Sequence, residues 1–310
     1  MQSIATFTLN PAIDGACEAQ SVRHTHKVRT TANRYDPGGG GINVARVVQR
    51  LGGNVRAHYL AGGATGGVLD NLLDRDGIAR SRIDIADHTR ISHAVFEHAT
   101  GREYRFVPEG PLVSEAEWQQ ALTAFAKINA DYLVFSGSLP RGVPADFYVR
   151  LIAGRDPQRA TRIVLDTSGA ALSAMLEASG LFLVKPSQGE LEQHLGRVLG
   201  DPEEIVAAAQ DIVGRGQARH VAVTMGHEGA ILVGEAGVYR LPAIPVEARS
   251  AVGAGDSFVG AMTLALAQGL PITDAFRRGV AAGTATVLTP GTGLCLSADV
   301  ERIYGEVPAL

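Results

Sequence analysis

Short apolar runs alternate with amphipathic stretches over the second half of the chain. Four such runs, each ending in polar or glycine residues, lie at 131–140, 162–169, 181–188 and 220–226. Strands of a parallel sheet have this appearance because both faces of the sheet are covered. Apolar residues recur with helical spacing in 203–216, as expected for a crossover helix. The pattern predicts an α/β fold with a mainly parallel central sheet.

Polar residues follow the predicted strands directly. Asp166, Lys185 and Thr224 stand at or just after the ends of three of them. Ligands of open α/β sheets bind at the carboxyl ends of the strands. We therefore expect these side chains to gather at one ligand-binding edge.

Two segments depart from the alternation. Residues 15–35 and 91–107 have the pattern of strands joined by turns, and Thr100-Gly101 supplies a hairpin turn in the second. We expect them to form a small β-sheet lid outside the main sheet, which could cover the ligand edge. Residues 1–310 are expected to form one domain that carries this lid.

Composition and charge exclude several classes of protein. With 19% charged residues, a net charge of -4 and no basic block, the chain has no signature of a nucleic-acid or membrane partner. It shows no secretory signal and no run of about 18 apolar residues, so a cytoplasmic location is expected. Cys17 and Cys295 are far apart in the sequence and predict two free thiols.

The stretch YDPGGGGINVARVVQRLGG, residues 35–53, places four glycines before a predicted helix. Ile42, Ala45 and Val48 would face the core, and Gly52 and Gly53 would end the helix. One or two glycines suffice for a turn, so four suggest that a ligand lies against bare backbone. Asn43, in the first turn, could donate to a sugar hydroxyl.

A second motif, SAVGAGDSFVGA, occupies residues 250–261. Gly253, Ala254 and Gly255 allow consecutive N–H groups to point into one concavity at a helix start, which makes an anion hole. Asp256 could be an N-terminal helix cap, or a carboxylate that takes the proton of an attacking hydroxyl. An anion hole beside a carboxylate provides two parts that phosphoryl transfer needs, which favours the second interpretation.

Together, PGGGGINVA and VGAGDSFVGA resemble the two signature regions of the ribokinase (PfkB) family of carbohydrate kinases. The resemblance covers essentially the whole chain and includes TLNPAID, SGSLPRGV, LVKPSQGE and TMGHEGA. Within the family it is greater to the ribokinase-type 6-phosphofructokinases than to ribokinase or adenosine kinase. It implies a ribokinase-like three-layer α/β/α sandwich whose small lid commonly pairs with that of a second subunit.

The resemblance also implies roles for individual residues. Asp256 would be the catalytic base for a sugar hydroxyl that attacks the γ-phosphate of ATP, while the amides of Gly253, Ala254 and Gly255 stabilise the transferring group. The positions that match the sugar site are Asp14, Gly38, Gly39, Asn43 and Ser138. Those that match the nucleotide site are Lys185, Ser187, Thr224, Gly226 and Gly229.

Four cations decide the expected substrate. Arg90 precedes one predicted lid strand, Arg105 lies inside the next, and Lys27 and Arg29 alternate along another. Taken singly, each has the properties of an ordinary surface charge. The joint match to phosphofructokinases indicates a phosphosugar, because guanidinium groups suit phosphate.

The resemblance implies metal ions as well. Mg²⁺ would be held mainly by ATP phosphates and water, with Glu190 acting indirectly. Family members carry Asn where this chain has Ser187, so metal or nucleotide affinity is expected to differ. A monovalent cation such as K⁺ would lie near Ser250, Val252 and Gly291. No pair of histidines has a metal-ligand spacing on a convincing helix or strand.

The leading hypothesis is ATP-dependent phosphorylation of the 1-hydroxyl of fructose 6-phosphate. Tagatose-6-phosphate kinase and 1-phosphofructokinase share the fold and the chemistry and remain alternatives. A non-catalytic sensor of sugar phosphate or nucleotide is the alternative of another class, although such a protein would not need Asp256. A homodimer through the lid is expected, because the lid strands would otherwise leave an apolar face and free edges.

Overall fold

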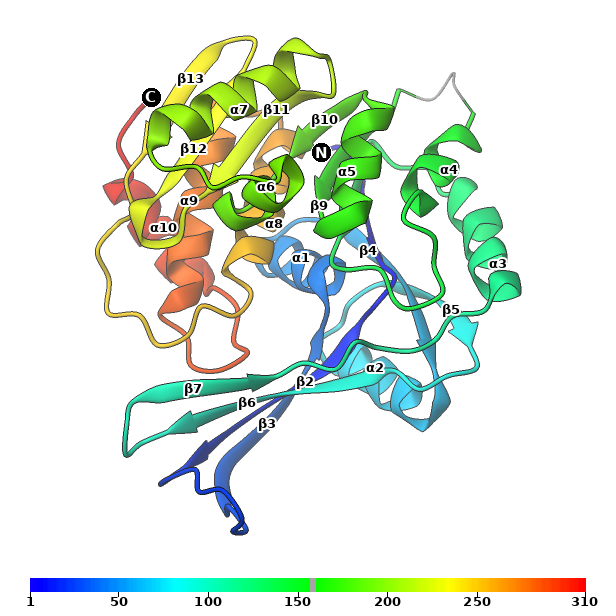
Figure 1. Cartoon of the computed structure of the whole chain (residues 1–310), viewed down its shortest axis with the longest axis vertical. Helices are drawn as coiled ribbons and strands as arrows, with labels where there is room; N and C mark the ends of the chain where they lie inside the picture. The colour runs from blue at the N-terminus through cyan, green and yellow to red at the C-terminus, as the bar shows by residue number, and fades with distance from the viewer. Residues whose placement is uncertain (157–159) are drawn as a thin grey trace.

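A nine-stranded sheet forms the centre of the computed structural model, which describes residues 1–156 and 160–310 (Figure 1). The strand order is β13-β12-β11-β10-β9-β8-β1-β4-β5, and all pairs are parallel except β11–β12 and β12–β13. The strands are β1 (Ile4–Thr8), β4 (Val55–Gly62), β5 (Arg80–Ile85), β8 (Tyr132–Ser136), β9 (Arg162–Asp166), β10 (Leu181–Val184), β11 (Ala218–Thr224), β12 (Ala230–Gly234) and β13 (Gly237–Leu241). The predicted α/β class and parallel strands are confirmed.

Helices cover both faces of this sheet, which gives the three layers. One core lies under α1 (Gly40–Arg50), α2 (Gly63–Arg75), α8 (Ala254–Ala267), α9 (Ile272–Val287) and α10 (Ser297–Glu306). The other lies under α3 (Glu115–Ala126), α4 (Phe147–Ala153), α5 (Gly169–Ala178), α6 (Gln188–Leu195) and α7 (Pro202–Gly214). No helix in the described ranges is long and apolar enough to cross a membrane.

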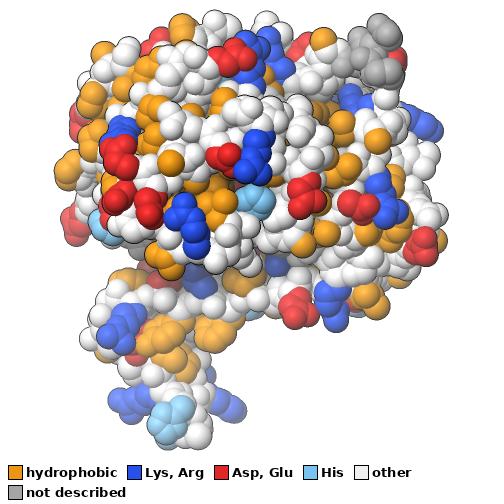
Figure 2. All heavy atoms as spheres, turned by 45° about the horizontal axis from the view of Figure 1, so that its top comes forward, with side chains coloured by type: hydrophobic (Ala, Val, Ile, Leu, Met, Phe, Trp, Pro, Cys, Tyr) orange, Lys and Arg blue, Asp and Glu red, His pale blue; other side chains and the backbone are white. Residues whose placement is uncertain are grey.

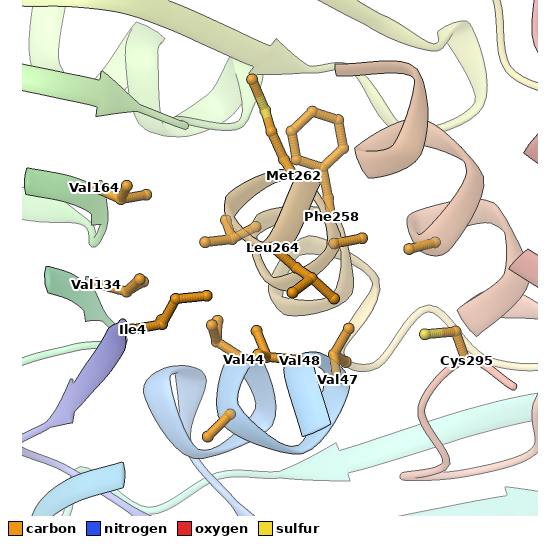
Figure 3. Close-up of a cluster of buried hydrophobic side chains, with 14 of the residues drawn as sticks. Ile4, Val44, Val47, Val48, Val134, Val164, Phe258, Met262, Leu264 and Cys295 are labelled. Carbon is orange, nitrogen blue, oxygen red and sulfur yellow. The ribbon is translucent and has the colours of Figure 1, made fainter. Parts of the chain in front are cut away.

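The packing of α1 against α8 positions both glycine-rich motifs. Val44, Val47 and Val48 of α1 face Leu264 and its neighbours on α8, next to side chains from β1, β8 and β9 (Figure 3). Gly260 of α8 allows the close approach, since a Cβ there would lie 2.9 Å from Cγ1 of Val47. Each fully buried aliphatic side chain contributes about 1.5–3 kcal/mol to folding. The two helix N-termini therefore meet on a rigid core.

A separate four-stranded sheet projects from this body, with the order β3-β2-β6-β7 (Figure 1). Its strands are β2 (Ala12–Ala19), β3 (Thr30–Gly38), β6 (Arg90–Glu97) and β7 (Arg102–Phe106). The expected small β-element is thus confirmed, and we call this sheet the lid. Strand β2 begins at Ala12 and β3 ends at Gly38, so both extend beyond the predicted range 15–35.

One detail of the predicted lid is wrong. Lys27 and Arg29 do not lie on a strand, because β3 begins only at Thr30 and both residues belong to the exposed segment between β2 and β3. Their alternation with Val28 imitates a strand, yet that segment has no strand partner. Figure 1 places it at the far end of the lid, away from the body.

Candidate active site

The GAGD motif forms the N-terminus of α8 at the carboxyl edge of the sheet. Gly253 is the N-cap and has a left-handed φ of 75°, and a Cβ there would lie 2.5 Å from Leu294 Cδ2. The first-turn N–H groups of a helix have no intrahelical acceptors and face outward with the positive end of the dipole. Asp256 is inside the first turn, so its interpretation as the N-cap is wrong.

The carboxylate of Asp256 is held by one amide. Asn43, in the first turn of α1, donates from Nδ2 to Asp256 Oδ2 over 2.9 Å. Among the residues that the structure describes, no hydrogen-bond donor contacts Oδ1. Burial, and then the negative charge of Asp166, raise the pKa of Asp256 to about 7, although Asn43 and Lys185 oppose the shift. A carboxylate with this pKa is suited to act as a general base near neutral pH.

Lys185 lies beside Asp256 in a cluster of carboxylates. Its Nζ makes a buried ion pair with Asp166 Oδ1 at 3.0 Å. Burial lowers the pKa of Lys185, but the charges of Asp166 and Glu190 outweigh burial and raise it overall. The amine is therefore a fixed positive charge. Asp166, which the sequence placed at this edge without a role, is the residue that fixes it.

The four glycines of the first motif have a packing reason. A Cβ on Gly38 would lie 2.0 Å from Asp14 Oδ2, and one on Gly39 would lie 2.8 Å from the backbone of Pro11. On Gly40 and Gly41 a Cβ would clash with the loop after β8 and with β1, respectively. The helix also begins at Gly40, so two of the glycines belong to it. Close packing thus gives a structural reason for all four glycines, and the ligand contact that the sequence suggests stays a prediction.

The sugar-matching residues lie where the lid joins the body. Asp14, on β2, is opposite Asp36 of β3. Burial raises its pKa, while the nearby positive charges of Arg90, Arg46 and Arg105 act in the opposite direction.

Ser138 follows β8 at the same edge. Its Oγ accepts a hydrogen bond from Asn10 Nδ2 at 3.2 Å. The structure therefore brings Asn43 and Asp14 near Asp256 and packs Gly38 against Asp14.

The two lid arginines differ in their surroundings. Arg90 is partly buried and donates over 2.9 Å to the carbonyl oxygens of both Pro108 and Asn10. Arg105 lies on β7 opposite Ala94 and is exposed. Both are close enough to Asp14 to affect its pKa, so the predicted convergence of Arg90 and Arg105 is present. Lys27 and Arg29 do not join them within one chain.

The nucleotide-matching residues follow β10 and β11. Ser187 caps α6: its Oγ accepts from the Glu190 amide over 3.3 Å and donates to Glu190 Oε2 over 2.9 Å. Thr224 pairs with Ser187 across the two strand ends. Gly226 and Gly229 have φ angles of 59° and 105°, and a Cβ on Gly229 would lie 2.1 Å from the Leu241 carbonyl oxygen.

Metal-binding groups are sparse in this cleft. The described residues contain no group of three or more His, Cys, Asp or Glu side chains that could hold a metal ion. Glu190 is partly engaged by Ser187, and Lys185 neutralises its neighbours. This donor set fits a Mg²⁺ ion that is held mainly by ATP oxygens and water.

The residues matched to a monovalent cation lie in two adjacent loops near the lid. The Ser250 amide donates to Val287 O, and Val252 N donates to Ser250 Oγ. Gly291 packs against Ala16 of β2, where a Cβ would lie 2.8 Å away.

Comparison with known proteins identifies the class. The model of the pfkB family carbohydrate kinases matches residues 8–299, and the chain belongs to this family. It is 45% identical over 304 residues to ATP-dependent 6-phosphofructokinase isozyme 2 of Mycobacterium tuberculosis, covering 97% of this chain and 88% of that protein. It is 41% identical to the Escherichia coli K12 protein of the same name, covering 98% of each.

A solved structure gives the same result. Phosphofructokinase-2 of Escherichia coli in complex with fructose-6-phosphate superposes with a TM-score of 0.92, 40% identity and 99% coverage of both chains. The resemblance drawn from the motifs and the ribokinase-like fold are therefore confirmed.

Proposed function

We propose that the chain transfers the γ-phosphoryl group of ATP to the 1-hydroxyl of fructose 6-phosphate, giving fructose 1,6-bisphosphate. The observation that carries this is the position of Asp256, between the N–H groups of α8 and the lid face with Asp14 and Arg105. The relatives named 6-phosphofructokinase isozyme 2, at 41–45% identity, support the same substrate.

The transfer assigns one task to each group. Asp256 accepts the proton of the 1-hydroxyl while that oxygen bonds to the γ-phosphorus and the bond to the ADP oxygen breaks. The amides of Gly253, Ala254 and Gly255 receive the charge that develops on the transferring group. Lys185 supplies fixed positive charge on the nucleotide side, and Asn43 holds the base in place.

Mg²⁺ would bind ATP phosphates and water, with Glu190 contributing through water. When bound, it neutralises phosphate charge during transfer. We propose a K⁺ site near Ser250, Val252 and Gly291. An Escherichia coli phosphofructokinase-2 structure in complex with potassium, 41% identical over 99% of both chains with a TM-score of 0.94, supports this.

Substrate choice separates this function from its rivals. The chain is 32% identical to 1-phosphofructokinase of Bacillus subtilis over 94% of both chains, so that activity is the second candidate. Arg90 and Arg105, on the lid face near Asp14, would hold the 6-phosphate while the 1-hydroxyl faces Asp256. A sugar with its phosphate at the 1-position would have to bind in the reverse direction.

We also propose that the lid pairs with the lid of a second copy. The cross-strand row Tyr35–Gly15–His93–Phe106 lies on the face opposite Asp14. Tyr35 is 50% exposed and Phe106 58% exposed, and apolar side chains gather on the projecting lid (Figure 2). Such a face is typical of a protein interface. A tetrameric inhibited form of the Escherichia coli enzyme shows that larger assemblies occur among relatives.

Sedimentation of Phe106→Asp tests the homodimer. The wild type should sediment as a dimer at micromolar concentration and the variant as a monomer. A wild type that is only monomeric would overturn the lid interface, and so would a dimer unaffected by the substitution.

The activity test is a coupled ADP-release assay with Mg-ATP, comparing kcat/KM for fructose 6-phosphate, tagatose 6-phosphate, fructose 1-phosphate, ribose and adenosine. Fructose 6-phosphate should be preferred, and its advantage over the unphosphorylated sugar ribose should shrink in Arg105→Ala. A preference for fructose 1-phosphate would establish the rival activity. Binding of these ligands without turnover would favour the sensor.

A further inference from the structure

A hollow of about 620 Å³ lies beside β3, where the lid meets α1 and the end of α2. Its walls are formed by Arg34, Asp36, Arg46, Gln49, Arg50, Arg75, Asp76 and Ile78. None of these residues is one of the positions matched to the sugar or the nucleotide, although Asp36 lies opposite Asp14 and Arg46 lowers the pKa of Asp14. The hollow is nevertheless adjacent to that site, because Arg46 is three residues from Asn43 on the same helix.

The walls carry an excess of positive charge, with four arginines against two aspartates. Asp36 is buried and already bound: Arg34 Nε lies 2.6 Å away, Arg46 and Arg75 lie at 3.5 Å, and Thr292 donates to it over 2.8 Å. More donors are present than these two carboxylates can accept, since each guanidinium has five N–H groups.

One buried donor in this wall lacks an aligned hydrogen bond. Arg46 is 4% exposed, and its Nε makes no hydrogen bond, although Asp76 Oδ2 lies 3.3 Å away as an ion pair. At the rim, the side chains of Arg34 and Arg75 are 48% and 53% exposed, so part of each guanidinium group is accessible to a bound molecule, while Asp36 and Asp76 hold the two groups in place. A buried cation behind two partly exposed ones is a suitable arrangement for holding an anion.

We propose that this hollow is a regulatory site for a small phosphate-bearing anion. Guanidinium groups match phosphate oxygens in a bidentate geometry. A volume of about 620 Å³ lies within the range of small-molecule sites and suits a phosphorylated metabolite. Surplus positive charge at a buried position excludes a cation, and the scarcity of apolar lining excludes a hydrophobic ligand.

The hollow is connected to the catalytic base by two hydrogen bonds. Arg46 donates from one terminal nitrogen, Nη1, to Pro37 O at 3.0 Å and to Asn43 Oδ1 at 3.2 Å. The amide of Asn43 in turn donates to Asp256 Oδ2. An anion that draws Arg46 toward the hollow weakens its bond to Asn43 and releases the amide that holds Asp256. The anion binds more tightly to the arrangement in which Arg46 is drawn toward the hollow than to the one in which Arg46 is bound to Asn43. Its binding therefore shifts the protein toward the first arrangement and lowers turnover.

The alternative is that these arginines only brace the lid against the body. Isothermal titration of the full-length protein with inorganic phosphate, without nucleotide or sugar, separates the two. Arg105→Ala removes part of the proposed sugar-phosphate site, whereas Arg34→Gln/Arg75→Gln removes the rim of the hollow and its excess charge. In Arg215→Gln/Arg302→Gln, two exposed surface arginines are lost, which controls for net charge.

The proposal expects a phosphate site that persists in Arg105→Ala and in the control, and that weakens at least 10-fold in Arg34→Gln/Arg75→Gln. Unchanged binding in that variant overturns the proposal, as does loss of all binding in Arg105→Ala. The single variant Arg75→Gln, altered at one half-exposed side chain, gives the same comparison if the double variant unfolds.

Turnover tests the coupling to Asp256. At saturating substrates, where competition for the active site is overcome, phosphate should still lower kcat of the wild type and should leave kcat of Arg34→Gln/Arg75→Gln unchanged. If phosphate binds in the hollow without any effect on wild-type kcat, the coupling through Arg46 and Asn43 is wrong. These arms do not depend on which sugar the enzyme prefers.

Discussion

The lid and the edge of the central sheet that carries Asp256 and Lys185, which we call the floor, hold their polar groups in different ways. On the floor, Asp256 is held by Asn43 and Lys185 by Asp166, on elements that pack in a rigid core. On the lid, Arg105 is exposed, and so are Tyr35 and Phe106 on the opposite face. The groups for the chemistry are fixed before substrate binds, whereas the groups for substrate choice lie on a sheet that is open on one face.

The contrast extends into the lid itself. Arg90 is held by two carbonyl oxygens at the base of the lid, while Arg105, further out, has no hydrogen bond or ion pair to any described residue. Preorganised groups lose little entropy when a ligand binds, whereas mobile ones must be ordered. The comparison therefore predicts that substitutions on the floor affect turnover and that those on the outer lid affect substrate selectivity.

The largest effect is expected for Asp256→Asn. The substitution removes the proton acceptor but retains a group that can meet Asn43, so kcat should fall by about 10²–10⁴-fold while ATP still binds. Asp274→Asn, which changes a partly exposed carboxylate on α9, is the matched control and should keep its activity. A kcat within a few-fold of wild type for Asp256→Asn would refute the assignment of the base.

Arg105→Ala and Arg90→Ala should separate the two parts of the lid. Loss of a charged hydrogen bond to phosphate corresponds to about 1.5–3 kcal/mol, so kcat/KM for fructose 6-phosphate should fall about 10–150-fold in both. Only Arg90→Ala should also unfold at lower denaturant concentration, because it frees the carbonyl groups of Pro108 and Asn10.

Arg102→Ala provides the control on the same strand. It alters an exposed cation at the start of β7. Because side chains alternate along a strand, Arg102 lies on the same face as Tyr104 and Phe106, and Arg105 lies on the other face. Its kinetics with fructose 6-phosphate should match the wild type. Equal losses in Arg102→Ala and Arg105→Ala would mean that general charge, not a phosphate contact, determines affinity.

The sequence predicted the floor better than the lid. Strand ends such as those at Asp166, Lys185 and Thr224 follow from local hydrophobic pattern and from the rule that ligands gather there, and the structure brings them together. The pattern predicted main-sheet strands only from residue 131 onward, so β1, β4 and β5 of the first half were missed.

Other features depend on contacts that a sequence does not display. Arg46 appears within INVARVV as one polar residue in a helix, and only the fold places it between Asn43 and Asp36. The four glycines predict ligand contacts, and the fold adds a packing reason that the sequence does not display, since they lie against backbone and side chains distant in sequence. The prediction that Lys27 and Arg29 lie on a strand was wrong for a related reason, because alternation of side chains alone does not show whether a segment has a strand partner.

Asn43→Ala should show how the floor tunes its base. The amide hydrogen bond lowers the pKa of Asp256, so its loss should raise that pKa above about 7. The acidic limb of the kcat/KM profile should therefore move to higher pH by about one unit, with up to a 10-fold additional loss near pH 6.5. If activity declines by the same factor at every pH, Asn43 does not act on the base.

The smallest effect is on the pH dependence of stability, and it is expected for Asp256 but not for Arg105 of the lid. The pKa of Asp256 is about 7 in the folded chain against an ordinary 3.8, so the folded state holds a proton that the unfolded state loses between these values. Stability thus falls as pH rises from about 4 to 7, and Asp256→Asn removes this penalty. Because Asp256 is partly exposed, we expect a gain of about 1–2 kcal/mol in the free energy of unfolding at pH 8 and none at pH 4. Urea unfolding at both pH values measures this gain; Arg105→Ala should show no such difference, and a destabilised Asp256→Asn at pH 8 would show that the carboxylate stabilises the site.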